Sequence, residues 1–394
     1  MNQSEQFVFR LCRRSFLSVW SYPNPRGKGG KELCDILVVC DPHVIIFSVK
    51  EVDLKETGET AIGWERWRRS AIKESAKQIY GAERWLNAAT SVVTREGEVA
   101  LSIPDSSVRR VHRVAVALGG HGEVPISVGN MGKGYVHVFD EVALDAIMAE
   151  LDTVTDFVKY LHDKEALEER DLQVITSGEE NLFASYLHNG RCFLPDANLL
   201  VIEDDLWEAL KSKPEYVSRK EADKDSYFWD KLIEELFNNP DKENVLFKTS
   251  ASEFERVVRV MAKEDRFCRR ILSKSFREFH QEAKTRSRMI QSPSGTLYVF
   301  LAFPHGEDRR YRIAELAGRC FVARGLNSSV TQVIGIATEQ YEVGKGFSLD
   351  AYYLLKDKWT SEDQAQVEYL QREFGYFRNL RQTHMSEDEY PKAS

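Results

Sequence analysis

The fold of the first half of this chain is decided by the stretch Glu32-Leu-Cys-Asp35-Ile-Leu-Val-Val-Cys40, Asp41-Pro-His43, Val44-Ile-Ile-Phe-Ser48-Val-Lys50. Its two apolar runs, 33–40 and 44–49, are rich in valine and isoleucine, which favours strands over helices. The Asp-Pro-His segment between them predicts a turn. The stretch therefore predicts a β-hairpin with an acid at the start of one strand and a lysine at the end of the next.

The segments on either side of this hairpin predict a domain of mixed helices and strands. Between residues 61 and 89, small and apolar side chains recur at the steps of three and four that mark a helix face. The segment 22–31 is rich in proline and glycine, which predicts a loop. Helices are predicted over 3–17, 61–89 and 140–163, and strands over 111–118, 124–128 and 135–139. We therefore predict an α/β domain over 1–165, with the charged stretch 164–171 as a linker.

The remaining residues, 166–394, predict a second α/β region. Its segment 252–290 has a helical pattern and is rich in lysine and arginine. From 296 to 377 the patterns predict a strand, a helix, two strands and a helix, in that order. We expect this region to recognise the substrate, to regulate the first domain or to mediate oligomerisation.

Length and composition narrow the class of protein. A chain of 394 residues with 42% hydrophobic residues can form two domains that each bury a core. No run of about 18 apolar residues predicts a transmembrane helix, and the N-terminal residues lack the apolar core of a signal peptide. We therefore expect a cytoplasmic protein that has no membrane contact.

Cysteine, histidine and charge patterns exclude some functions. The six cysteines form no CxxC pair and the nine histidines form no HExxH motif, which argues against zinc sites and a disulfide framework. The net charge of -8 argues against non-specific nucleic-acid binding. This net charge does not exclude a local basic cleft, because phosphate contacts depend on where the charges lie.

The hairpin carries side chains that suit phosphodiester chemistry. Asp35 and Lys50 lie at strand ends that can meet at one end of the sheet. A carboxylate there can hold Mg²⁺ or Mn²⁺, with the backbone carbonyl of Val49 as a further oxygen ligand. The lysine can stabilise the phosphate in the transition state or position the attacking water. A structural role also remains open, with Asp35 as a loop hydrogen-bond acceptor and Lys50 as a solvated strand end.

This pattern resembles the PD-(D/E)XK nuclease superfamily, in which an acid opens one strand and (D/E)-x-K follows on the next. Asp35 matches the first acid and Lys50 matches the lysine, whereas Ser48 stands where the second acid belongs. The Ser-Val-Lys sequence is similar to that of certain tetrameric restriction endonucleases whose second acid has moved to the following helix. The resemblance implies a restriction-endonuclease-like fold, a mixed central sheet flanked by helices, over 1–165.

The resemblance also implies roles for the helix that follows the hairpin. Glu65 is the first candidate for the relocated acid that shares the metal with Asp35, and Glu74 is the second. Gln78 would bind a substrate phosphate or a metal-bound water, and Ser48 would hydrogen-bond that water. The structural alternatives are a helix-start acid for Glu65, a surface ion pair for Glu74 and a core amide for Gln78.

Two groups of basic residues are candidates for nucleic-acid contact. Arg26, Lys28 and Lys31 lie in the glycine-rich loop before the hairpin, and Arg269 and Arg270 lie in the basic segment 252–290. Such side chains bind the phosphate backbone. The alternative for both groups is a solvated surface.

Together these features predict a metal-dependent endonuclease, with DNA preferred to RNA as the substrate and Mg²⁺ or Mn²⁺ as the cofactor. The family resemblance implies a role in bacterial defence, restriction or repair. The alternative is a nuclease fold that has lost activity with its second acid and only binds nucleic acid or a partner protein. The sequence leaves open whether the chain forms a homo-oligomer.

Overall fold

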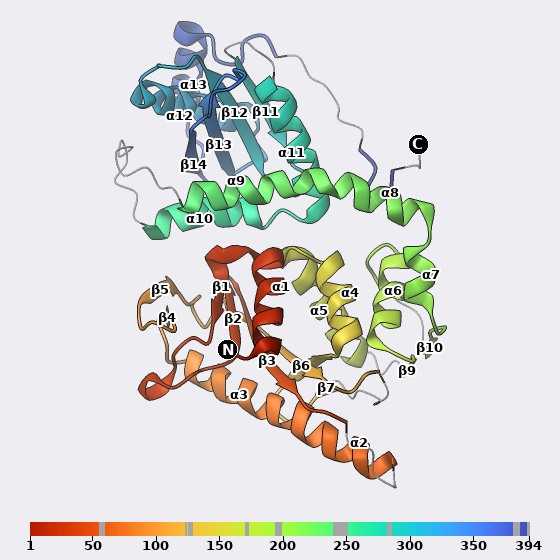
Figure 1. The fold of residues 1–394 in the computed structure, drawn as a ribbon. Coiled ribbons are helices and arrows are strands. Elements are labelled where there is room, and N and C mark those ends of the chain that lie inside the picture. Colours follow the sequence, from red (N-terminus) through yellow and green to blue (C-terminus); the bar gives the residue numbers. More distant parts are fainter. Residues whose placement is uncertain are drawn as a thin grey trace. The chain divides into compact units, whose positions relative to one another are not determined.

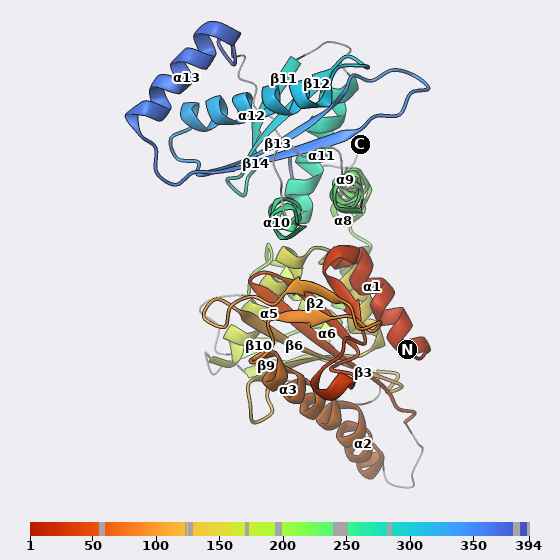
Figure 2. The same cartoon turned by 90° about the vertical axis from the view of Figure 1, so that its left-hand side faces the viewer.

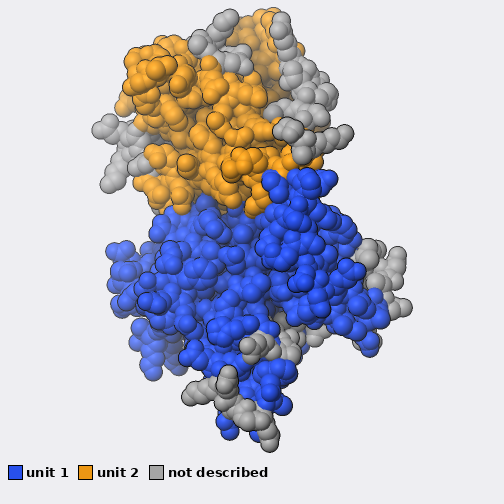
Figure 3. All heavy atoms as spheres, turned by 45° about the vertical axis from the view of Figure 1, so that its right-hand side comes forward, with its two compact units in different colours: residues 1–217 blue, residues 218–394 orange. Residues whose placement is uncertain are grey.

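The computed structural model describes residues 1–54, 60–122, 124, 129–169, 173–193, 199–238, 251–281, 286–380 and 387–391. The chain divides into two compact units, residues 1–217 and 218–394, which Figure 3 shows in different colours. The sequence placed the boundary between 165 and 166, so unit 1 is larger than predicted.

Unit 1 is built around a six-stranded mixed sheet with the order β1-β2-β3-β6-β8-β7. β1, β2 and β3 are antiparallel neighbours, β6 is parallel to both β3 and β8, and β7 is antiparallel to β8. The strands are β1 (Ser21–Pro23), β2 (Ile36–Cys40), β3 (His43–Glu51), β6 (Arg110–Leu118), β7 (Gly129–Asn130) and β8 (Tyr135–Phe139). The predicted hairpin and the predicted strands over 111–118 and 135–139 are therefore confirmed, whereas the strand over 124–128 falls largely outside the described residues.

Helices cover both faces of this sheet (Figure 1). Alternate strand residues point to opposite faces, so Ile46 packs in one core cluster with Ile79 of α3, while Phe47 packs against Phe16 of α1 and Phe157 of α5. The helices are α1 (Gln3–Trp20), α2 (Thr60–Arg68), α3 (Glu74–Leu86), α4 (Glu141–Glu150) and α5 (Val154–Glu169). This arrangement is the mixed central sheet flanked by helices that the sequence predicts.

The helix predicted over 61–89 is formed by α2, a π-helical turn, η2 (Arg69–Lys73), and α3. Its buried face is the predicted stripe, and Trp67 at its start donates a hydrogen bond from Nε1 to the carbonyl of Val52 at 2.7 Å. Gly119 lies next to this contact with φ +85°, and a Cβ there would lie 2.4 Å from the Val52 carbonyl oxygen. Only glycine fits this close approach of β6 to the end of β3.

The single helix predicted over 140–163 is wrong, because the chain breaks between α4 and α5. Thr153 caps a new helix there, since its hydroxyl accepts a hydrogen bond from the backbone N–H of Asp156 at 3.0 Å. The stretch 164–171 is not a linker over its first residues, because α5 continues to Glu169. An apolar stripe that runs on through the break hides it from periodicity.

Residues beyond α5 complete unit 1. They form β9 (Gln173–Ile175), α6 (Glu179–His188), β10 (Leu199–Val201) and α7 (Leu206–Lys211), and β9 pairs with β10 in parallel. Lys164 of α5 forms a buried ion pair with Glu179 of α6 at 2.5 Å, and the rings of Tyr160 and Tyr186 lie 5.0 Å apart. These contacts explain why the compact unit extends past residue 165. A separate small hairpin joins β4 (Ser91–Val93) to β5 (Val99–Ser102).

Unit 2 contains a four-stranded sheet with the order β11-β12-β13-β14. β12 and β13 are parallel, and the outer pairs are antiparallel. Helix α12 (Arg309–Leu326) covers one face of this sheet and α11 (Arg266–Gln281) the other (Figure 2). Leu316 of α12 belongs to the core on the first face, and on the second face Phe300 of β12 contacts Phe276 of α11 and Trp229 of α9 (Tyr227–Asn238). Its strands are β11 (Arg286–Gln291), β12 (Leu297–Phe303), β13 (Gln332–Glu339) and β14 (Leu349–Leu355).

The helices of unit 2 are α9 (Tyr227–Asn238), α10 (Ala251–Ala262), α11 (Arg266–Gln281), α12 (Arg309–Leu326) and α13 (Ser361–Phe374), and α8 (Pro214–Asp223) contains the boundary between the units. The order predicted from 296 to 377 is confirmed. The helical prediction over 252–290 is wrong at its end, because 286–291 form β11, which pairs with β12. No helix in the described part of the chain is both long and apolar enough to cross a bilayer.

Candidate active site

The structure brings Asp35 and Lys50 together at one end of the central sheet. Ile36 pairs with Phe47, so Asp35, which directly precedes β2, lies opposite the Ser48–Lys50 end of β3. The Asp35 carboxylate accepts a hydrogen bond from the backbone N–H of Val49 at 2.6 Å. The sequence assigned the carbonyl of Val49 to the metal, whereas the contact seen here uses its N–H.

Asp35 is almost completely buried, at 2% exposure. Burial raises the pKa of its carboxyl group above the ordinary value, because the low-dielectric surroundings disfavour the charged form. The Val49 N–H and the Lys50 charge oppose this effect, and the charge of Glu32 and a hydrogen bond with its side chain add to it. A nearby cation would therefore stabilise the charged form of this carboxyl group.

Lys50 is half-buried and pairs with Ala117 of β6 in the sheet. Among the residues that the structure describes, it forms no salt bridge, and its charge lowers the pKa of Asp35. An ammonium group held beside a buried carboxylate and not tied to a surface acid is free to contact a substrate phosphate.

Ser48 and Gln78 form a second polar contact on the same face of the sheet as Lys50. The Ser48 hydroxyl is buried and donates a hydrogen bond to Oε1 of Gln78, on α3, at 3.0 Å. Both predicted site residues are therefore positioned by one bond between β3 and α3. The same bond also satisfies a core amide, which was the structural alternative for Gln78.

The structure does not place Glu65 or Glu74 with Asp35. Glu65 forms an exposed ion pair with Lys73 at 2.9 Å, and Glu74 pairs with Lys77 at 3.5 Å. Within α2, Glu65 precedes the buried Trp67 by two residues, which is roughly 200° of helix rotation, so it faces solvent. Hydrogen bonding and charge from Lys73 lower the pKa of Glu65. Both acids are therefore paired with exposed lysines, and a metal-binding role for either one stays a prediction.

Glu32 is an acid that does lie beside Asp35, because the two side chains share a hydrogen bond. Next to it, Asn24 donates a hydrogen bond from its backbone N–H to the Asp35 carbonyl at 2.9 Å. The side-chain Oδ1 of Asn24 is buried, and within the described part of the chain it has no hydrogen-bond partner. The pairing of β1 with β2 brings these residues together. No sequence pattern predicts β1, because 22–31 has the composition of a loop.

Asn24 and Glu32 both line a cavity of about 380 Å³, together with Met1, Arg26, Gly30 and Arg95. Arg26 is anchored there, since its Nε donates to the carbonyl of Arg95 at 2.8 Å. Lys28 and Lys31 are exposed on the adjacent turn, η1 (Lys28–Gly30). The first group of predicted nucleic-acid contacts therefore lies beside the acidic residues.

The second group, Arg269 and Arg270, does not form a nucleic-acid surface. Both side chains are buried in unit 2, at 1% and 0% exposure. Arg269 pairs with Asp230 at 2.6 Å and Arg270 pairs with Asp223 at 3.0 Å. Charge counting along the basic segment could not show this, because the neutralising acids come from α8 and α9.

In the described part of the chain, no three His, Cys, Asp or Glu side chains are grouped so that they could hold a metal ion. The candidate site offers two carboxylates and the Asn24 amide oxygen instead. Comparisons of the chain with protein-family models, with curated proteins and with solved structures found no match. Any conclusion about function therefore rests on the residues and their geometry.

Proposed function

We propose that unit 1 is a metal-dependent nuclease that hydrolyses phosphodiester bonds, preferably in DNA. The observation that carries this proposal is the contact of the buried Asp35 with the Val49–Lys50 end of β3. It places a carboxylate and a cation at the same end of the sheet, which is the arrangement on which the PD-(D/E)XK resemblance depends. The order of α1, three antiparallel strands, the α2–α3 helix and a parallel β6 agrees with a restriction-endonuclease-like fold.

The residues present fit a divalent cation such as Mg²⁺ or Mn²⁺. These ions prefer oxygen ligands. Asp35 has a carboxyl group whose pKa burial has raised, Glu32 adds a second carboxylate, and Asn24 adds a buried oxygen that has no partner. We propose that these three side chains would hold the metal, with Glu32 in the role that the sequence assigned to Glu65 or Glu74.

In this proposal each residue has a separate task. A divalent cation in such a site supplies activation of water and neutralisation of phosphate charge. Lys50 would donate hydrogen bonds to a phosphate oxygen, where negative charge increases in the transition state. Ser48 and Gln78 would fix the orientation of α3 relative to β3, and Arg26, Lys28 and Lys31 would bind the nucleic-acid backbone. A role in bacterial defence, restriction or repair remains part of the proposal through the resemblance alone.

A second candidate function is a module that binds nucleic acid or a partner protein without cleaving it. The observation that favours it is the Ser48–Gln78 hydrogen bond, because Ser48 stands where the usual second acid belongs and its hydroxyl group already has a partner. Metal-dependent cleavage of nucleic acid is expected of the nuclease and not of the binding module.

The test uses supercoiled plasmid and end-labelled oligonucleotides with the full-length protein. We expect nicking or linearisation with Mg²⁺ or Mn²⁺, none with a chelator, and none for Asp35→Ala. Asp145→Ala, which changes an exposed acid of α4, is the matched control and should retain full activity. Absence of cleavage by folded wild-type protein with both metals would favour the binding module.

A further inference from the structure

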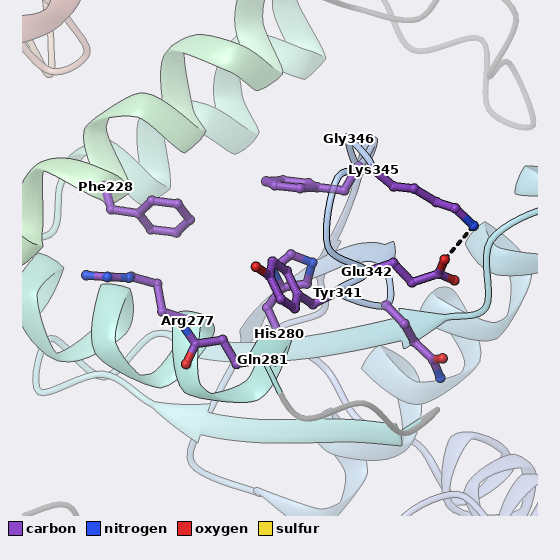
Figure 4. Close-up of a pocket in the computed structure, with 10 residues that line it drawn as sticks. Phe228, Arg277, His280, Gln281, Tyr341, Glu342, Lys345 and Gly346 are labelled. Atoms are coloured by element: carbon purple, nitrogen blue, oxygen red, sulfur yellow. Dashed lines mark ion pairs between the residues drawn. The ribbon is translucent and has the colours of Figure 1, made fainter.

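A second candidate site lies in unit 2, in a cavity of about 190 Å³ between α9, α11 and the β13–β14 connection. Figure 4 shows Phe228, His280 and Tyr341 turned into the same space, with Arg277 beside Phe228. All of the lining residues belong to unit 2. The lining is completed by Gln281, Gln340, Glu342, Lys345, Gly346 and Phe347.

His280 has a buried nitrogen atom that a ligand could hydrogen-bond. The side chain is buried, and its Nε2 atom has no hydrogen-bond partner among the residues that the structure describes. Burial lowers the pKa of His280, and a hydrogen bond with the backbone of Glu339 opposes that shift. Because Nε2 is the nitrogen without a partner, we assign the Glu339 hydrogen bond to Nδ1, and a ring protonated on Nδ1 presents Nε2 as a buried acceptor. A ligand that donates an N–H or O–H would satisfy it.

Aromatic rings surround this acceptor. The ring of Phe347 lies 4.8 Å from that of His280 and the ring of Tyr341 lies 5.8 Å from it, both edge-on. Tyr341 and Phe347 nevertheless remain 49% and 43% exposed. Exposed aromatic side chains next to an unpaired acceptor are the components of a stacking platform for a planar ring.

Two cations stand at the rim of the cavity. Arg277 pairs with Asp225 at 2.6 Å, and Lys345 pairs with Glu342. Both pairs are exposed, and exposed ion pairs contribute little to stability because water screens the charges. A phosphate group can therefore compete for either cation at little cost.

We propose that this cavity binds a nucleotide, with an unpaired base stacked among Tyr341, Phe347 and Phe228, a base N–H donated to His280 Nε2, and the phosphate at Arg277 or Lys345. The cavity is smaller than the roughly 300–1,000 Å³ of pockets that enclose a drug-sized ligand. It therefore admits one planar ring system and leaves the sugar and phosphate at the surface. The nucleotide can be a free mononucleotide or one unit of a single strand, and binding here does not depend on cleavage by unit 1.

The test measures binding to the full-length Lys50→Ala variant, which is expected to leave the probe intact. One arm titrates adenosine 5′-monophosphate by calorimetry, and the other titrates a single-stranded oligonucleotide that contains 2-aminopurine and follows the quenching of its fluorescence on stacking. Saturation in the first arm identifies a free nucleotide as a ligand. Saturation in the second arm alone identifies a base within a strand.

Variants of the lining residues, compared with a control variant outside the cavity, show whether the ligand binds in this cavity. Phe347→Ala and Tyr341→Ala should each weaken binding about 5- to 140-fold, the range that follows from about 1–3 kcal/mol per stacked base at 1.4 kcal/mol per tenfold. Val343→Ala lies on the same connection, is 87% exposed and does not line the cavity, so it should bind like the parent protein. His280→Phe keeps a ring but removes the acceptor, and should also weaken binding.

The proposal is overturned if neither probe binds, or if Phe347→Ala and Val343→Ala bind equally well. Binding of indole with no binding of either nucleotide would also overturn it and would point to an aromatic side chain of a partner protein as the occupant. Because the comparison of variants changes only residues of unit 2, failure here leaves the nuclease proposal standing, and failure to cleave DNA leaves this one standing.

Discussion

Asp35 combines burial with a charge that its surroundings only partly satisfy. Burial raises the pKa of this carboxyl group, while the Val49 N–H and Lys50 stabilise its charged form. Evolution tolerates such a conflict where function needs it, because active sites trade stability for chemistry. The side chain is therefore a good place to test function and stability together.

Asp35→Asn is expected to stabilise the metal-free protein at neutral pH. Between the ordinary pKa of an aspartate and the raised pKa of Asp35, the folded state binds more protons than the unfolded state, so stability falls as pH rises through this window and stays lower above it. Asparagine carries no charge and can still accept the Val49 N–H. We expect the unfolding temperature of unit 1 at pH 7.5 to rise by a few degrees, which corresponds to about 1 kcal/mol.

The same variant should lose its response to metal. A ligand that binds only the folded state raises the unfolding temperature, so Mn²⁺ should stabilise the wild type and not Asp35→Asn. Equal stabilisation of both proteins by Mn²⁺, measured by differential scanning calorimetry, would show that Asp35 is not a metal ligand.

Glu32→Gln separates the acid beside Asp35 from the acids on the helix. We expect this change to weaken Mn²⁺ binding at least about tenfold and to reduce cleavage in parallel, because it removes a proposed ligand. Glu65→Gln and Glu74→Gln remove exposed ion pairs and should leave both quantities within about twofold. The reverse result would return the second metal ligand to the helix, as the sequence resemblance implied.

At the scale of elements, two strands of unit 1 carry buried histidines, His112 on β6 and His137 on β8, and the half-buried His43 at the start of β3 lies beside His112. His43 Nδ1 lies 3.0 Å from His112 Nε2, and burial lowers the pKa of His112 to about 3, helped by the charges of His43, His137, His162 and Arg113. Burial also lowers the pKa of His137 well below its usual value. Both rings are therefore neutral in the folded protein, although they titrate normally in the unfolded chain.

This cluster predicts that unit 1 loses stability in mild acid. Below about pH 6.5 the unfolded chain takes up protons that the folded chain cannot bind, so stability falls as pH falls. For His112 the loss reaches about 1.4 kcal/mol at pH 5.5, one unit below the ordinary pKa. Urea unfolding at pH 7.5 and 5.5 should show a smaller loss for His112→Asn than for the wild type or for the exposed control His121→Asn. Equal losses in all three proteins would mean that His112 is not the titrating group.

The elements with strong local patterns could be predicted from the sequence, and those made by pairing could not. The hairpin is two Val- and Ile-rich runs with a turn, and the 61–89 helix has one apolar stripe. By contrast, β11 has the sequence Arg286-Ser-Arg-Met-Ile-Gln291, which continues the charge pattern of the preceding helix. Its strand conformation comes from pairing with β12, where Arg288 lies opposite Phe300. The break between α4 and α5 comes from one capping threonine inside an unbroken stripe.

The same distinction applies to the candidate site. Asp35, Ser48 and Lys50 were predictable because the hairpin itself brings them together. Asn24 and Glu32 were missed, because they reach Asp35 through the short β1 and its adjoining loop. The resemblance assigned Glu65 to the metal from its position in the sequence, but it could not predict that this side chain points away from the sheet on its helix.

At the scale of the whole molecule, the boundary at 217 has a physical consequence. The fragment 1–217 should unfold cooperatively near the temperature of unit 1 in the full chain, whereas the fragment 1–165 should be strongly destabilised. Cutting at 165 removes Glu179, the ion-pair partner of the buried Lys164, and truncates α5 before its end at Glu169. It also exposes Tyr160, which packs against Phe183 and Tyr186 of α6. Equal unfolding temperatures for the two fragments would place the boundary where the sequence did.

The most direct test of the central claim is the single-turnover rate of DNA cleavage by Lys50→Ala, measured together with its Mn²⁺ affinity. Lys50 is proposed to act on the phosphate and not to hold the metal. We therefore predict a rate at least about 100-fold below that of the wild type with Mn²⁺ binding retained. A Lys50→Ala protein that cleaves at the wild-type rate would contradict the proposed role of this end of the sheet in catalysis.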